Sequence, residues 1–238
     1  MNKVCFKKFT LVELLCVIAI IGILASILLP KIGAAREKTI RAVCANNQSQ
    51  LYKAYYTYSS QNSHFLVSAE TRNARGHAPA WFRDSRWRFD THVLNSPIWP
   101  YIENKAVFRC PSEPRAARKN GNYKRSYSIN VHLNGRGWVS NRVLNVSEVL
   151  TTSNTYVFLD DADPRGRNLG SFVAGWHSRW VDWPGSNHGK KTIPLSFFDG
   201  HTENYTYKEK TTSEIKWFWS RAGYEDRKAF MDMAHPLR

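Results

Sequence analysis

The chain has 238 residues, of which 42% are hydrophobic and 13% aromatic, and its formal net charge is +15. This composition supplies a packed core and excludes an intrinsically disordered chain, and the length fits one globular domain plus an anchor. The positive charge favours anionic partners, but no block of five or more Lys and Arg residues marks a nucleic-acid patch, so nucleic acid is not the favoured partner.

An unbroken apolar segment occupies residues 9–29 and is followed by Pro30. At about 1.5 Å rise per residue, a helix of this length spans roughly 30 Å, the thickness of the hydrocarbon core of a bilayer. Three lysines and no acid precede it within residues 1–8. The positive-inside rule therefore predicts a cytoplasmic N-terminus, and the absence of a second such segment predicts a single-pass membrane protein.

The apolar segment contains one acid, Glu13. A charged side chain at the centre of a membrane helix costs about 2.5–3.5 kcal/mol on insertion scales, and less near the end of the helix. Two interpretations stay open. Glu13 is either an interfacial acid that reaches the lipid headgroups, or a carboxylate that pairs with a positive group on a neighbouring subunit.

Residues 8–15, with the sequence KFTLVELL, resemble the N-terminal signature of type IV pilins and of type II secretion pseudopilins. In that family a prepilin peptidase cuts before the Phe and methylates the new amine. The resemblance makes Lys8–Phe9 the processing site, Glu13 the fifth mature residue, and Pro30 the proline that kinks the helix. The family usually has Gly before the cut, where this chain has Lys8. Without cleavage, residues 1–8 would remain as a cytoplasmic extension.

The resemblance also implies partners: other pilins or pseudopilins, the prepilin peptidase, an inner-membrane assembly platform and inner-membrane lipid. The competing interpretation is an ordinary secretory signal that is cleaved near residues 33–35, where three small residues follow the apolar segment. Two features oppose it. The apolar run exceeds the usual signal core of about 7–15 residues, and Glu13 lies near its start.

After Pro30, apolar residues recur at helical spacing to about residue 60. The sequence thus predicts a leader over residues 1–8, a transmembrane helix over 9–30, an amphipathic stem helix over 31–60 and a periplasmic or extracellular head over 61–238. In the head, strands are expected over 126–131, 155–159, 193–198 and 201–207, and a helix over 213–234. The fold class is α+β: a long N-terminal helix packed on a small antiparallel sheet, as in pilins.

Two of the four cysteines, Cys44 and Cys110, lie beyond the apolar segment. An even pair in an oxidising compartment is a disulfide candidate, and the alternative is two separate buried thiols. Neither cysteine belongs to a CxxC or Cys/His cluster in the sequence, so the spacing predicts no zinc site. Residues 107–111, around Cys110, resemble a Phe-X-Cys-Pro segment of pilin-like proteins from environmental bacteria.

Asp160, Asp161 and Asp163 follow a predicted strand in an otherwise basic chain. Calcium takes oxygen ligands from such loops, and secretion-type major pseudopilins carry a calcium site in a C-terminal loop. Calcium is therefore the one cofactor considered, and the spacing is not that of an EF-hand. The alternative is three solvated loop acids.

His188, followed after ten residues by Asp199 and Gly200, resembles the H-X9-DG segment of planctomycete-type pilin-like proteins, with one residue more in the gap. We expect an Asp-Gly hairpin turn here, because Gly tolerates positive φ. His188 either approaches Asp199 across the strands or is a satisfied structural histidine.

The sequence contains no Gly-rich phosphate loop, no HExxH and no G-x-S-x-G elbow, so we expect no enzyme. The expected function is that of a structural subunit of a type II secretion pseudopilus or a type IV pilus-like filament, assembled through the N-terminal helix. Two alternatives stay open: a minor pilin whose basic, Trp-rich head binds DNA or an anionic polysaccharide, and a membrane-tethered or secreted enzyme.

Overall fold

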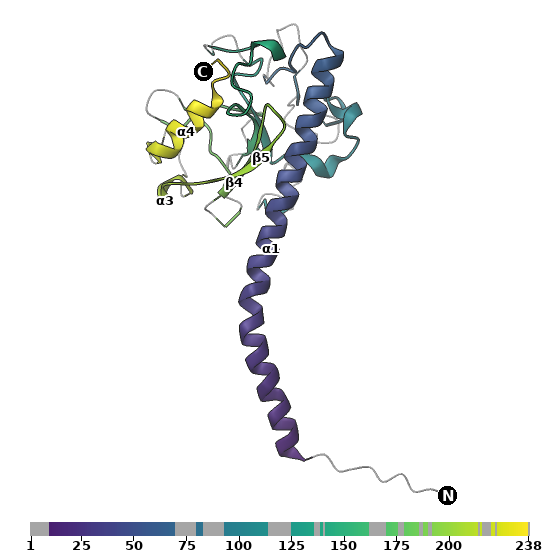
Figure 1. Ribbon diagram of the computed structural model, residues 1–238, viewed down its shortest axis with the longest axis vertical. Helices are drawn as coiled ribbons and strands as arrows, with labels where there is room; N and C mark the ends of the chain where they lie inside the picture. Colours follow the sequence, from purple (N-terminus) through teal and green to yellow (C-terminus); the bar gives the residue numbers. More distant parts are fainter. Residues whose placement is uncertain are drawn as a thin grey trace, which may run out of the picture. The chain divides into compact units, whose positions relative to one another are not determined.

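The structure is a computed structural model of the chain (Figure 1). It describes residues 10–69, 80–82, 93–113, 125–135, 139, 141–161, 170–175, 179–185, 188–189, 192–213, 215, 220–221 and 223–237. Its elements, in chain order, are α1 (Leu11–Gln61), η1 (Trp99–Tyr101), η2 (Lys105–Phe108), β1 (Tyr127–Asn130), η4 (Val146–Glu148), β2 (Tyr156–Asp160), β3 (Ser171–Phe172), β4 (Thr192–Phe197), β5 (Thr202–Thr206), α3 (Lys210–Ser213) and α4 (Tyr224–Ala234).

Helix α1 confirms the long helix that the sequence predicts over residues 10–60. Contacts divide the chain into two compact units, Met1–Thr39 and Ile40–Arg238. In the first unit the described helix exposes apolar side chains on all sides as far as Leu29, and Pro30 lies inside it without ending it. This part of α1 is long and apolar enough to cross a membrane, a property that it shares with signal sequences.

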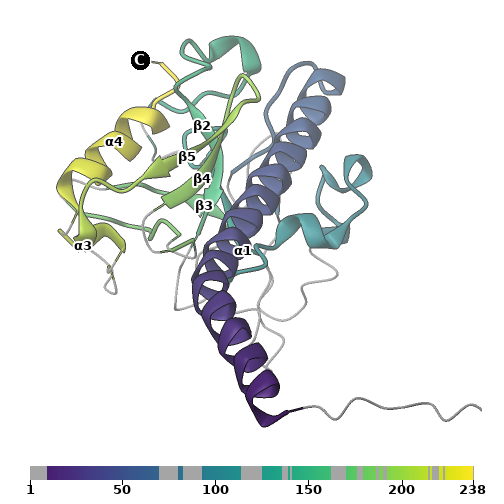
Figure 2. The same cartoon turned by 60° about the horizontal axis from the view of Figure 1, so that its bottom comes forward.

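In the second unit, one face of α1 is buried against the head (Figure 2). The buried residues recur every three or four positions, as an amphipathic helix requires. They are Cys44, Asn47, Gln48, Leu51, Tyr52, Ala54, Tyr55 and Ser59. The polar ones bond to the head: Gln48 donates to the carbonyl of Pro194 at 2.9 Å and Tyr52 to that of Phe198 at 2.5 Å. Both the apolar contacts and the hydrogen bonds therefore fix this half of α1 against the sheet.

The sheet has five strands in the order β3-β1-β2-β4-β5. All neighbours are antiparallel except β1 and β3, which pair in parallel through Ile129↔Ser171 and Asn130↔Phe172. The expectation of an antiparallel sheet is therefore wrong at one edge. The two-residue strand β3 is too short for a periodic pattern to reveal it in the sequence.

Helices α1 and α4 lie on opposite sides of the sheet (Figure 2), and each belongs to a different apolar cluster. The α1 cluster contains Leu51 and Tyr55 with Phe158 of β2, and the α4 cluster contains Phe230 with Tyr156. Alternation along the strands supplies side chains to both faces, so the sheet is the middle of three layers. The α+β, pilin-like plan of a long N-terminal helix on a small sheet is confirmed.

The predicted Asp-Gly hairpin is present between β4 and β5, and Gly200 has φ of +95°. The helix predicted over residues 213–234 is confirmed for its second half, and of its first half only residues 213, 215, 220–221 and 223 are described. Helix α3 ends at Ser213 and α4 begins at Tyr224, after Gly223 in the left-handed region at φ +67°. A residue in that conformation does not continue a right-handed helix, so a new helix begins there.

Candidate functional site

The N-terminus of α1 is built as a capping box, the Ser/Thr-x-x-Glu arrangement in which the first and fourth residues satisfy each other's backbone. Glu13 Oε2 accepts hydrogen bonds from the backbone N–H and the hydroxyl of Thr10, both at 2.8 Å. The Glu13 N–H donates back to the Thr10 hydroxyl at 3.3 Å. Within one chain, the acid of the apolar segment therefore starts its own helix. Lys8 and Phe9, the predicted processing site, lie outside the described residues.

The apolar side chains on both sides of Glu13 are exposed. Leu11 is 77% exposed, Leu24 62% and Leu29 68%. Exposed apolar surface of this extent is unfavourable in water and indicates a lipid or protein partner.

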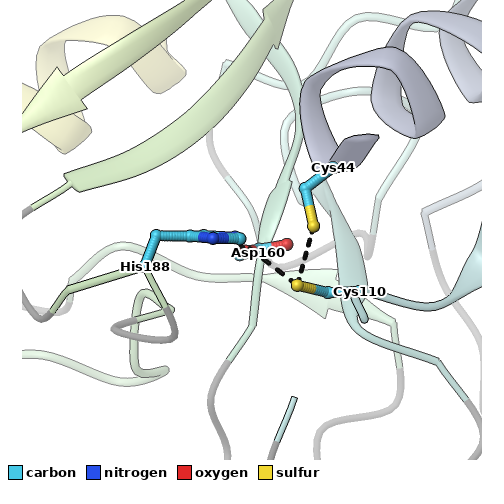
Figure 3. Close-up of side chains that lie close together, drawn as sticks. All are labelled: Cys44, Cys110, Asp160 and His188. Atoms are coloured by element: carbon cyan, nitrogen blue, oxygen red, sulfur yellow. Dashed lines mark hydrogen bonds and ion pairs between the residues drawn. The ribbon is translucent and has the colours of Figure 1, made fainter. Parts of the chain in front are cut away.

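A second constellation lies inside the head (Figure 3). Cys44 comes from α1, Cys110 follows η2, Asp160 ends β2, and His188 precedes β4. All four side chains are buried, and one donor atom from each lies within 4.8 Å of the others. Four segments that are distant in the sequence thus converge on one small volume, and the side chains point toward one another.

Direct contacts link the four residues in a chain. The Cys44 thiol donates to Cys110 Sγ at 2.7 Å, Cys110 Sγ lies 3.4 Å from His188 Nε2, and His188 Nε2 lies 2.8 Å from Asp160 Oδ2. The structure does not bond the two sulfurs, because their separation of 2.7 Å exceeds the bond length of about 2.05 Å in a disulfide. The Cys44–Cys110 disulfide stays a prediction, for which the structure places the two sulfurs side by side.

Burial and mutual hydrogen bonds shift the pKa values of these groups. Burial raises the pKa of Asp160 to about 7, against the opposing hydrogen bond from His188. Burial lowers the pKa of His188, but its hydrogen bonds with Asp160 and Cys110 prevail and raise it to about 9. The hydrogen bond between the two sulfurs lowers the pKa of Cys110 and raises that of Cys44. Negative charge is therefore favoured on Cys110, between the other thiol and the imidazole.

The walls around the cluster leave two polar atoms without a hydrogen-bond partner among the described residues. These are Asp160 Oδ1 and His188 Nδ1, both fully buried. Gly185 closes the site beside Asp160: a Cβ on Gly185 would lie 2.5 Å from that of Asp160. The Gly185 N–H also donates to the Asp160 carbonyl at 2.8 Å. A buried carboxylate oxygen with unused acceptor capacity is costly, which marks this position as a site that a ligand would complete.

The predicted calcium ligands are not brought together among the described residues. Asp160 faces His188, whereas Asp161 accepts a hydrogen bond from Ser128 at 2.9 Å and lies 3.6 Å from the guanidinium of Arg125. Neighbouring residues at the end of a strand point to opposite faces, which separates the two carboxylates. Asp163 lies outside the described residues, so the calcium site stays a prediction.

His188 and Asp199 do not meet either. Asp199 instead accepts hydrogen bonds from the backbone N–H of His201 at 3.1 Å and from its ring, with an Oδ1–Nδ1 distance of 2.5 Å. Asp199 and Gly200 thus shape the hairpin turn, while His188 belongs to the buried cluster. The H-X9-DG-like segment therefore splits into two separate structural roles.

Reasoning from sequence spacing missed the cluster. No two of its members are closer in sequence than 28 residues, the separation of Asp160 and His188. The expectation that neither cysteine belongs to a Cys/His cluster is therefore wrong in three dimensions, because the contacts between α1, β2 and the loops bring the four residues together. The available signal was the residue types: the cysteine pair, the acidic run at Asp160 and the His188 segment all supply side chains that can bind a metal.

Comparison with known proteins gives one informative likeness. The type II secretion system core protein G of Klebsiella pneumoniae is 29% identical to this chain over 108 residues, which is 45% of this chain and 68% of the relative. No protein-family model matches the chain. No solved structure matches it either. More than half of the chain is therefore outside the compared region.

Proposed function

We propose that this protein is a structural subunit of a type II secretion pseudopilus or a related type IV pilus-like filament, and that it assembles through its N-terminal helix. The observation that carries the proposal is the exposed apolar helix after Thr10, with one acid in its first turn. The likeness to the type II secretion core protein G supports it from an independent direction. The role is mechanical rather than catalytic.

In the proposed assembly, each helix exchanges lipid for the helices of neighbouring subunits. Leu11, Leu24 and Leu29 are among the side chains that would pack between subunits. Because lipid tails are as apolar as these side chains, packing rather than the hydrophobic effect would hold the filament together. The partners are further copies of this chain, other pseudopilins and an inner-membrane assembly platform, and inner-membrane lipid surrounds the subunit before assembly. The head would then lie in the periplasm or outside the cell.

Glu13 would set the axial register of the subunits. In the proposed processing, the prepilin peptidase cuts between Lys8 and Phe9 and methylates the new amine, which then pairs with Glu13 of a neighbour. A carboxylate accepts several hydrogen bonds, so the capping contacts with Thr10 leave capacity for that amine. The same carboxylate would thus cap the N-terminus of its own helix and neutralise the N-terminal amine of a neighbouring subunit.

Two substitutions separate the charge of Glu13 from its capping role. Glu13→Ala removes both, whereas Glu13→Gln keeps an acceptor that a capping box can use and removes only the charge. We expect both variants to insert into the membrane and both to lose filament assembly by about tenfold or more, as the loss of a buried charge partner predicts. The measurement is the amount of sheared or cross-linked filament per unit of membrane-inserted subunit.

Glu37 provides the matched control, because it is the other acid of α1. Glu37→Gln should assemble normally. Mass spectrometry of the same filaments reads the N-terminus, and N-methylated Phe9 is the expected first residue. Normal assembly of Glu13→Gln together with failure of Glu13→Ala would reduce Glu13 to a helix cap and remove the register role.

A further inference from the structure

We propose that Cys44, Cys110, Asp160 and His188 bind one zinc ion as a closed structural site. The proposal rests on the buried cluster alone, and it holds or fails independently of filament assembly. It concerns a part of the head to which the sequence patterns assign only a disulfide, a loop acid and a turn histidine.

The chemistry of the donors selects the metal. The site offers two sulfurs, one imidazole nitrogen and one carboxylate oxygen, each from a different side chain. Zinc is borderline soft and takes this mixture in four-coordinate sites, whereas calcium and magnesium require oxygen ligands. Only Asp160 supplies an oxygen ligand here, so the cluster does not suit calcium or magnesium. On binding, the two thiols become thiolates and release their protons.

The distances fit a tetrahedron with small adjustments. Zinc–sulfur bonds of about 2.3 Å and zinc–nitrogen or zinc–oxygen bonds of about 2.0–2.1 Å require edges of about 3.3–3.8 Å between ligands. The separation of Cys110 Sγ and His188 Nε2 is already 3.4 Å. The Cys44–Cys110 and His188–Asp160 separations are 2.7 and 2.8 Å, so each of those donor atoms would move outward by roughly 0.5 Å or less.

A disulfide explains less of the site than a metal does. It would use the two sulfurs and leave His188 and Asp160 as a buried imidazole–carboxylate pair that takes no part in the bond. Burial of a carboxylate and an imidazole is costly unless their polar atoms are satisfied. One zinc ion would be coordinated by all four side chains, and its positive charge would lie beside the carboxylate.

The consequence of such a site is cross-linking of the head. Cys44 lies on the stem helix α1, Asp160 at the end of the central strand β2, and Cys110 and His188 in the connections before β1 and β4. All four coordination positions are filled by protein, as in structural zinc sites, so no position remains for a substrate. Metal binding would therefore stabilise the attachment of the stem helix to the sheet.

The first test is the metal content of the full chain, purified in detergent without a metal-affinity step and then incubated with zinc. We expect about one zinc per chain. Cys44→Ser and His188→Asn should lose it by about tenfold or more, since each removes a ligand. The controls remove the same residue types elsewhere: Cys16→Ser changes an exposed thiol of α1 and His201→Asn changes the turn histidine. Both controls should keep their zinc.

The second test uses the unaltered chain, so it does not depend on the folding of any variant. A chelator should lower the thermal unfolding midpoint, zinc should restore it, and a thiol reductant should leave it unchanged. Cobalt(II) in place of zinc should give the absorption of a tetrahedral thiolate site. If the reductant lowers the midpoint, the chelator does not, and the intact mass is two hydrogens lower, the site is a Cys44–Cys110 disulfide and the proposal is wrong. Indifference to both reagents would also overturn it.

Discussion

The two units of the chain differ in what surrounds their apolar residues. In Met1–Thr39 the described helix leaves its apolar side chains exposed, with Leu29 at 68%. In Ile40–Arg238 the same helix α1 buries Leu51 and Tyr55 completely, and polar groups are buried beside them. The first unit therefore exposes apolar surface that is unfavourable in water, whereas the second unit buries its own core. One continuous helix, α1, thus has exposed apolar side chains in its first part and buried ones in its second.

The largest effect that separates the two units should come from the core of the head. Phe158 is fully buried, with its ring centroid 5.9 Å from that of Tyr55 and 5.2 Å from that of Trp81. Phe158→Ala should lower the free energy of unfolding by about 3–5 kcal/mol, because it leaves a cavity between helix and sheet. Denaturant unfolding of the full chain in detergent, followed by Trp fluorescence, measures the change.

Phe65 supplies the control for this prediction, since its side chain is 47% exposed. Phe65→Ala should change the free energy of unfolding by no more than about 0.5–1 kcal/mol. Equal losses of unfolding free energy in Phe158→Ala and Phe65→Ala would contradict the burial of Phe158 in the core of the head. Membrane insertion should be unchanged in both, because neither residue belongs to the apolar helix.

The converse prediction concerns the apolar half of α1. Leu24→Arg should make membrane insertion less favourable by up to about 2.5–3.5 kcal/mol, since it places a charge inside the apolar segment. It should leave the denaturant unfolding of the head unchanged. The fraction of protein resistant to alkaline extraction from membranes measures insertion, and Leu24→Ala is the matched control. Destabilisation of the head by Leu24→Arg would contradict the division into two units.

The division also explains what the sequence could predict. Helix α1 follows from periodicity and an unbroken apolar run, and the β4–β5 hairpin follows from Asp199 and Gly200 between two β-forming runs, because these signals are local. The resemblance to pilins likewise rests on contiguous residues at the N-terminus. Local patterns are sufficient where the chain's neighbours in space are also its neighbours in sequence.

The buried cluster could not be predicted in that way. Asp160 and Asp161 read as two members of one acidic loop, but the first ends β2 and faces His188 while the second faces Arg125. Strand alternation points the two carboxylates to opposite faces. To predict this, the last residue of β2 must be known, and a sequence pattern does not locate a strand end to one residue. Cys44 and Cys110 meet only because α1 packs across the sheet. The same tertiary packing produces the parallel edge strand β3, which has no sequence pattern of its own.

The smallest predicted effect lies at the start of α1, where a local contact and an assembly contact share one side chain. Thr10→Ala removes the hydroxyl that bonds Glu13 Oε2 at 2.8 Å and accepts from the Glu13 N–H at 3.3 Å. Loss of such a cap costs about 0.5–2 kcal/mol, so amide exchange in the first turn should accelerate by roughly two- to thirtyfold in detergent, with the head unaffected. Thr10→Ser keeps the hydroxyl and should exchange at the original rate.

The same pair of variants tests how Glu13 serves assembly. If the capping box orients the Glu13 carboxylate toward a neighbouring amine, Thr10→Ala should reduce filament yield while Thr10→Ser does not. The reduction should be smaller than that of Glu13→Gln, because the charge remains and only its direction is loosened. A Thr10→Ala filament yield equal to that of the unaltered chain, with faster exchange in the first turn, would separate the two roles. Glu13 would then pair with its neighbour without help from its own helix cap.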